Sequence, residues 1–178
     1  MGLGLSDGVR HHPAMRWCEP VLPYGPMATV DVPVEEAKAL CSLKKTASPL
    51  AAWDESDIAG NREMTFGVVC DPPRRGLVVE LYMTQGRKVR RQKMNFGLWD
   101  RSEPVWERVY QLTVAQSDMP THAEGGDIWY GSHDHLGEPR RQNHLDGASF
   151  AEGLKFFCEQ TNLTLEDAIE DPFKFDLK

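Results

Sequence analysis

The chain lacks several features that would place it outside the interior of a cell. It has no run of about 18 apolar residues, so no segment of it is expected to cross a membrane as a helix. Its N-terminus has no basic stretch followed by an apolar one, which argues against a secretory signal. We therefore expect a cytoplasmic location and no membrane partner.

Paired cysteines are missing as well. The four cysteines are scattered through the chain, and none of them forms a Cys-x-x-Cys pair; they are Cys18, Cys41, Cys70 and Cys158. This spacing argues against a cysteine-only zinc site and against a disulfide framework, and it favours reduced thiols. No Gly-x-Ser-x-Gly elbow, P-loop or Rossmann glycine fingerprint is present, so the sequence offers no evident nucleophile or nucleotide-binding loop.

The composition is that of an ordinary globular protein, but the charge is unevenly spread. Hydrophobic residues make up 40% of the chain and charged residues 26%, with a net charge of −7 that speaks against a general nucleic-acid coat. Five cations fall within the seven residues from Arg87 to Lys93, whereas acids dominate from Glu152 onward. The basic run predicts either a local basic face or a solvated strand edge protected by cations.

The pattern of apolar residues predicts one α+β domain. Residues 1–26 have no sustained period and are predicted to form a flexible tail, which leaves residues 27–178 as the domain. A helix is expected from Val32 to Lys45, with Asp31 as its cap and Pro33 in its first turn. Four β-rich segments with short connections then favour an antiparallel meander; they are Met64–Cys70, Leu77–Thr84, Lys88–Leu98 and Val105–Gln116.

The C-terminal part is predicted to be helical. Ser149 and Glu152 form a capping box for a helix from Phe150 to about Asn162. A second, shorter helix is expected from Thr164 to Pro172, and the alternation of Phe173, Phe175 and Leu177 suggests an edge strand. The expected fold is thus a meander sheet of five to six strands, packed by an N-terminal helix and one or two C-terminal helices.

One stretch, His122 to Arg141, contains the side chains best suited to catalysis or metal binding. It contains three of the six histidines and four glycines. A fifth strand from Asp127 to His135 would place alternate residues on one face, among them Trp129, His133 and His135. The two histidines would then project side by side, with their Cβ atoms about 6–7 Å apart.

Three interpretations of this stretch remain open. In the first, His133 and His135 bind zinc with a third ligand from His122, Asp127 or His144, and an open fourth position would make the site catalytic. In the second, the histidines act without a metal as general base and general acid in RNA cleavage. That interpretation uses His122, His133 and His135 as catalytic residues, and as substrate-binding residues Arg90, Arg91, Trp129, Arg140 and Arg141.

The third interpretation is structural. The stretch would be a glycine-bent hairpin whose histidines contact only backbone groups or solvent. Asp134 lies between the two paired histidines in sequence and is expected on the opposite face, as a turn or surface residue.

The order of these residues carries a resemblance. His122, then Gly125-Gly126, then Gly-Ser-His-Asp-His from Gly131 to His135, resembles a family of uncharacterised phage and mobile-element proteins. It is more distantly similar to small endoribonuclease toxins of toxin–antitoxin systems. The resemblance covers roughly Met64 to the C-terminus. It implies an RNA-cleaving protein that needs no cofactor, with RNA and an antitoxin or host protein as partners.

The leading hypothesis from the sequence is therefore a histidine-based endoribonuclease. The first alternative is a zinc-dependent hydrolase or structural zinc protein that uses the same three histidines. The second is a non-enzymatic phage counter-defence protein, whose acidic C-terminal face binds a basic host surface.

Overall fold

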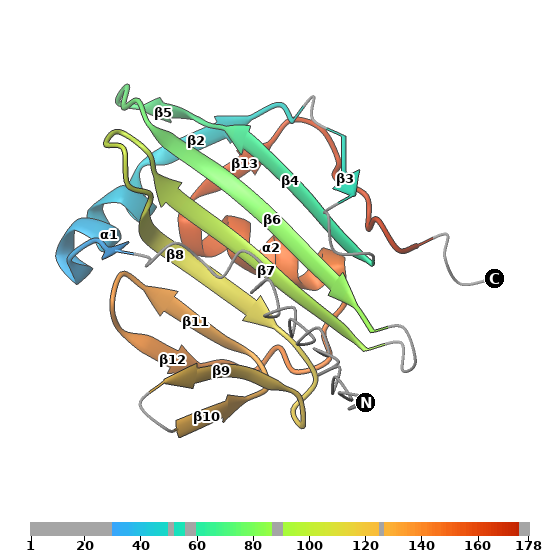
Figure 1. The fold of residues 1–178 in the computed structure, drawn as a ribbon. Helices are drawn as coiled ribbons and strands as arrows, with labels where there is room; N and C mark the ends of the chain where they lie inside the picture. The colour runs from blue at the N-terminus through green and yellow to red at the C-terminus, as the bar shows by residue number, and fades with distance from the viewer. Residues whose placement is uncertain (1–29, 50–51, 56–59, 87–90, 125–126, 175–178) are drawn as a thin grey trace, which may run out of the picture.

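The fold is organised around one large β-sheet (Figure 1). The computed structural model describes residues 30–49, 52–55, 60–86, 91–124 and 127–174. The strands of the large sheet follow the order β12-β11-β8-β7-β6-β4-β3, and β1 pairs with β8 from outside this path. Their bounds are β1 (Val30–Asp31), β3 (Asp54–Glu55), β4 (Asn61–Gly67), β6 (Leu77–Gln85), β7 (Gln92–Asp100), β8 (Glu107–Val114), β11 (His133–Leu136) and β12 (Arg140–Gln142).

The centre of this sheet is the predicted meander. Strands β4, β6, β7 and β8 pair with one another in antiparallel fashion, and β11 pairs antiparallel with the other edge of β8. The α+β class and the meander are therefore confirmed. Within the described residues the sheet has eight strands, more than the five to six expected, because short strands such as β1, β3 and β12 extend it.

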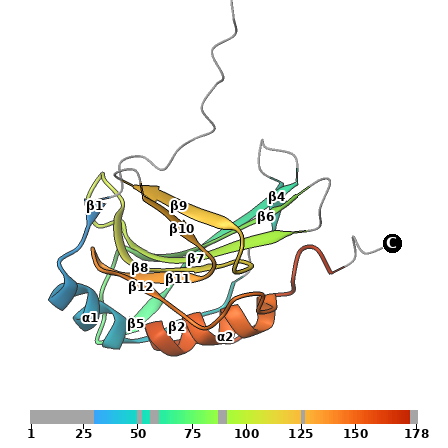
Figure 2. The ribbon, with the colours of Figure 1, turned by 90° about the horizontal axis from the view of Figure 1, so that it is seen from below.

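A hydrophobic core lies between the sheet and helix α2 (Phe150–Thr161). Alternate residues of β6 and β7 are buried on the helix side, and two of them, Leu81 and Phe96, are at most 1% exposed. The Phe96 ring lies 5.7 Å from that of Phe150 and 6.0 Å from that of Phe157, measured between centroids. Figure 2 shows α1 and α2 on this side of the sheet, with β9 and β10 on the other.

The prediction of the first C-terminal helix is confirmed, and the prediction of a second helix is wrong. Ser149 and Glu152 form the capping box of α2, and the helix ends where Asn162 adopts a left-handed conformation with φ of 49°. The chain then forms strand β13 (Leu163–Leu165), which pairs parallel with β2 (Lys44–Ala47). Strand β5 (Val69–Asp71) completes this second sheet. A nonlocal backbone partner therefore overrides the helical tendency of the sequence.

The N-terminal helix is shorter than predicted. Helix α1 runs from Val34 to Ser42, and Pro33 rather than Asp31 occupies the N-cap position. The Asp31 carboxylate instead accepts hydrogen bonds from the Arg108 guanidinium at 2.6 and 2.9 Å. The predicted tail (residues 1–26) and residues 175 and 177 lie outside the described part of the chain. Among the described helices, none is long and apolar enough to cross a membrane.

Candidate metal centre

The predicted strand from Asp127 to His135 is divided in two. Strand β10 (Asp127–Tyr130) ends one residue before Gly131, whose φ of 73° bends the chain, and β11 begins at His133. The backbone N–H of Ser132 donates to the Asp146 carboxylate at 2.6 Å and fixes this bend. The expectation of one continuous strand face is therefore wrong, because the alternation stops at Gly131.

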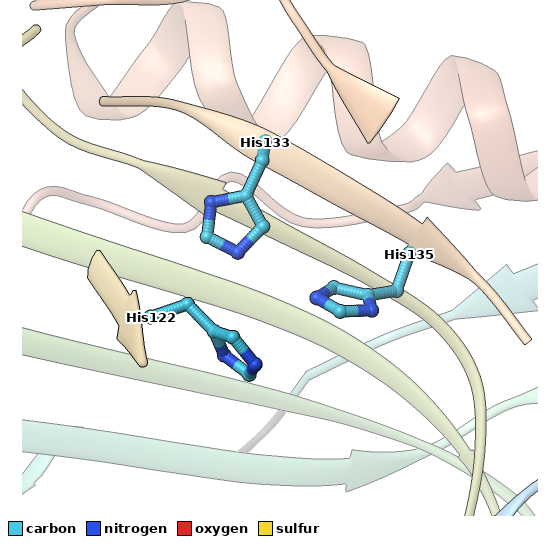
Figure 3. A group of neighbouring side chains, drawn as sticks. All are labelled: His122, His133 and His135. Atoms are coloured by element: carbon cyan, nitrogen blue, oxygen red, sulfur yellow. The ribbon is translucent and has the colours of Figure 1, made fainter. Parts of the chain in front are cut away.

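The break allows a hairpin to fold over the sheet. Strand β9 (Pro120–Glu124) pairs antiparallel with β10, and His122 is opposite Trp129 in this pairing. The β9–β10 hairpin lies on the side of the sheet away from the helices (Figure 2). From β9, the ring of His122 faces those of His133 and His135 on β11 (Figure 3).

The three histidines form one cluster. Each ring offers a nitrogen such that these three atoms lie within 4.8 Å of one another. The ring centroids are 5.3 Å apart for His133 and His135, 6.0 Å for His122 and His133, and 5.7 Å for His122 and His135. His144, one of the other candidate ligands, packs against Phe156 instead. Among the candidate third ligands whose side chains the structure describes, the fold brings His122 to the pair.

Burial decides the protonation of the two strand histidines. His133 is 2% exposed and His135 is 4% exposed, whereas His122 is half-buried. Burial is the main cause that lowers the pKa of His133 to about 4 and that of His135 to about 3, and the nearby positive charge of Arg140 contributes to both shifts. Both imidazoles are therefore neutral near pH 7, which is the form that binds metal ions.

The Nδ1 atoms of the two strand histidines differ in their surroundings. His133 Nδ1 lies 3.3 Å from the Thr121 hydroxyl and 3.5 Å from the Gly131 carbonyl oxygen, so these groups orient its ring. His135 Nδ1 is buried and has no hydrogen-bond partner among the described residues. A buried ring nitrogen without a partner is unfavourable unless a ligand satisfies it.

Two of the predicted substrate-binding residues lie beside the cluster. The Trp129 ring is 6.3 Å from that of His133, between centroids. The guanidinium carbon of Arg140 lies 3.8 Å from the centre of the Trp129 ring, and Arg140 pairs in register with His135. The structure thus places an aromatic ring and a cation next to the histidines.

The other predicted arginines are placed elsewhere or fall outside the described residues. Arg141 follows Arg140 on β12 and forms an ion pair with Asp134, which is in register with it on β11. Arg91 forms an ion pair with Asp118 at 2.8 Å. Arg90 lies outside the described residues. Because side chains alternate between the two faces of a strand, Arg140 and Arg141 on β12 lie on opposite faces of the sheet.

Asp134 is not the surface or turn residue that was expected. It is only 4% exposed, because β8 and β12 flank β11 on both sides and Arg141 covers its carboxylate.

A further residue near the site, Lys93, was recognised in the sequence only as part of the basic run. Its ammonium group donates to the backbone oxygen of Thr121 at 3.0 Å, one residue from His122.

Comparison of the chain with protein-family models, with curated proteins and with solved structures gives no match. The resemblance to mobile-element proteins and to endoribonuclease toxins therefore stays a prediction. The chemistry open to the site follows from its own geometry.

Proposed function

We propose that His122, His133 and His135 bind one divalent transition-metal ion, zinc above all, and that the protein is a metal-dependent hydrolase. The observation that carries this proposal is the convergence of three ring nitrogens within 4.8 Å of one another. Ligand nitrogens on a tetrahedral zinc ion lie roughly 3.3 Å apart, given Zn–N bonds of about 2.0–2.1 Å. Metal binding would therefore need side-chain rotations that bring the three nitrogens closer together.

The type of ligand supports zinc and related metals. Neutral imidazoles suit zinc, copper, iron and nickel, whereas calcium and magnesium prefer oxygen ligands. The cluster found among the described residues contains three histidines and no fourth protein ligand. Three protein ligands with an open position are typical of catalytic zinc sites, where the ion lowers the pKa of a bound water to about 7.

A metal-free endoribonuclease is the second candidate, and Trp129 beside Arg140 favours it because bases stack on aromatic rings and guanidinium planes. The histidines fit it less well. A general acid must carry a proton near neutral pH, but burial holds the pKa of His133 and His135 far below that. In this candidate, His122 would have to supply the proton without help from the other two rings.

Zinc titration of metal-free protein by calorimetry separates the two candidates. We expect one zinc ion per chain with sub-micromolar affinity, and at least a hundredfold weaker binding by the His122→Ala variant. His122 is half-buried on the hairpin, so its replacement should leave the folded core intact. His144→Ala is the matched control, because His144 is exposed and packs on Phe156. Unchanged zinc affinity in His122→Ala would contradict the proposal, as would RNA cleavage that persists in a chelator.

A further inference from the structure

The position of Lys93 points to the substrate class of this site, an inference that rests on the proposed metal centre. On β7, Lys93 and Asn95 share the sheet face that carries His133, because Asn95 is in register with Thr113 and Thr113 with His133. The Lys93 ammonium donates to the Thr121 backbone oxygen at 3.0 Å. The Thr121 hydroxyl in turn lies 3.3 Å from His133 Nδ1.

Lys93 is a half-buried cation that no carboxylate of the described residues neutralises. Its ammonium donates to a neutral backbone carbonyl, which uses one of the three N–H donors of the group. Burial lowers the pKa of Lys93, which reflects the cost of keeping this charge away from water. An anion bound beside Lys93 would offset that cost and accept the remaining donors.

Arg140 supplies positive charge from the opposite side of the cluster. Its guanidinium is held against the Trp129 ring on β10 while its backbone belongs to β12. The positive charges of Lys93 and Arg140 both lower the pKa of His133, so both side chains lie within electrostatic range of the site. A divalent ion at the histidines would add two further positive charges between them.

We propose that the site binds and hydrolyses a phosphate ester, with its phosphoryl oxygens held by Lys93 and Arg140 next to the metal. A phosphoryl group offers several oxygens to separate donors at once and carries one or two negative charges. In the reaction, a water oxygen bonds to phosphorus, the bond from phosphorus to the ester oxygen breaks, and a proton from the water ends on the departing alcohol. The products are phosphate, or a phosphate monoester from a diester, and the alcohol.

The test uses the full-length protein loaded with cobalt(II), whose visible absorption reports on the ligands of the ion. Inorganic phosphate should change this spectrum and bind with a measurable Kd. Lys93→Gln and Arg140→Gln should each weaken phosphate at least tenfold while cobalt still binds, and two separate variants guard against a folding defect in one. Lys44→Gln is the matched control, because Lys44 is exposed on β2.

The same titration with a phosphate monoester, dimethyl phosphate and acetate distinguishes the substrate classes. Tighter binding of a phosphate monoester than of dimethyl phosphate indicates small monoesters, and the reverse order indicates phosphodiesters such as nucleic acid. Acetate that binds as tightly as phosphate would overturn the proposal, as would phosphate affinity unaffected by both variants. Cobalt binding without any response to phosphate overturns this inference alone, whereas absence of cobalt binding overturns the metal centre and this inference together.

Discussion

His133 and His135 carry their imidazole rings into the interior, where a proton on either ring is costly. In the unfolded chain a histidine has a pKa of about 6.5, whereas burial lowers the pKa of His133 in the folded protein to about 4. Between these two values the unfolded state binds a proton that the folded state does not. Stability therefore falls as the pH decreases through this window.

The metal-free protein should lose stability on mild acidification. As the pH falls from 6.5 to 4, the shift of His133 alone corresponds to roughly 3 kcal/mol of the free energy of unfolding. Guanidinium titrations at several pH values measure this loss. The double variant His133→Gln, His135→Gln should show a clearly shallower pH dependence over the same range, and His144→Gln should not. An equal slope in the double variant would refute the protonation argument.

At the scale of elements, the bend between β10 and β11 holds the His122 hairpin over the other two histidines. Gly131 adopts a φ of 73° there, and a Cβ atom on it would lie 2.7 Å from the Asp146 carboxylate. The same carboxylate accepts the Ser132 N–H that fixes the bend. A side chain at position 131 must therefore displace Asp146 as well as adopt a backbone conformation that L residues avoid.

Gly131→Ala and Gly147→Ala make a matched pair. Gly147 has nearly the same φ, 72°, but a Cβ atom on it would meet no other atom within 4 Å, so its replacement should cost only the backbone strain of about 1–2 kcal/mol. Gly131→Ala should cost roughly 1–3 kcal/mol more, because the partly buried hydrogen bond from Ser132 to Asp146 is lost. It should also weaken zinc binding, whereas Gly147→Ala should not. Thermal and chemical denaturation with zinc titration test both; equal costs would exclude a role for Asp146.

Across the whole molecule, Lys45 ties the two helices to the small sheet. This lysine is fully buried on β2, and its ammonium donates to the carbonyl oxygens of Cys41 at 3.1 Å, Leu43 at 2.7 Å and Thr161 at 2.7 Å. These carbonyls belong to the ends of α1 and α2, where backbone oxygens lack partners within the helix. One side chain thus donates hydrogen bonds at the C-terminal ends of both helices.

Lys45→Met should be among the most destabilising single changes outside the apolar core. Methionine fills a similar volume but removes the ammonium donor from three carbonyls, two of them buried, at a cost of roughly 3 kcal/mol or more. Lys44→Met, at the exposed neighbouring position, should change stability by no more than about 0.5 kcal/mol. Urea denaturation of the two variants gives the comparison. Similar midpoints would show that the buried ammonium contributes little.

Local patterns in the sequence predicted much of this fold. The capping box and apolar face of α2 and the alternation of β6, β7 and β8 are properties of neighbouring residues, and these elements are confirmed. Strand β13 was missed because its partner β2 lies far earlier in the chain. The same limit applies to the site. Spacing indicated His133 and His135, but the contact of Lys93 with Thr121 joins β7 and β9, which lie far apart in the chain.

The convergence of the three histidines on one ion is the central claim, and anomalous X-ray scattering at the zinc edge tests it most directly. Crystals of the metal-loaded protein should show one strong peak within about 2.0–2.1 Å of a ring nitrogen from each of His122, His133 and His135. Data collected below the edge provide the control for the identity of the metal. A peak bonded to other residues, or no peak between these rings in zinc-loaded crystals, would contradict the account.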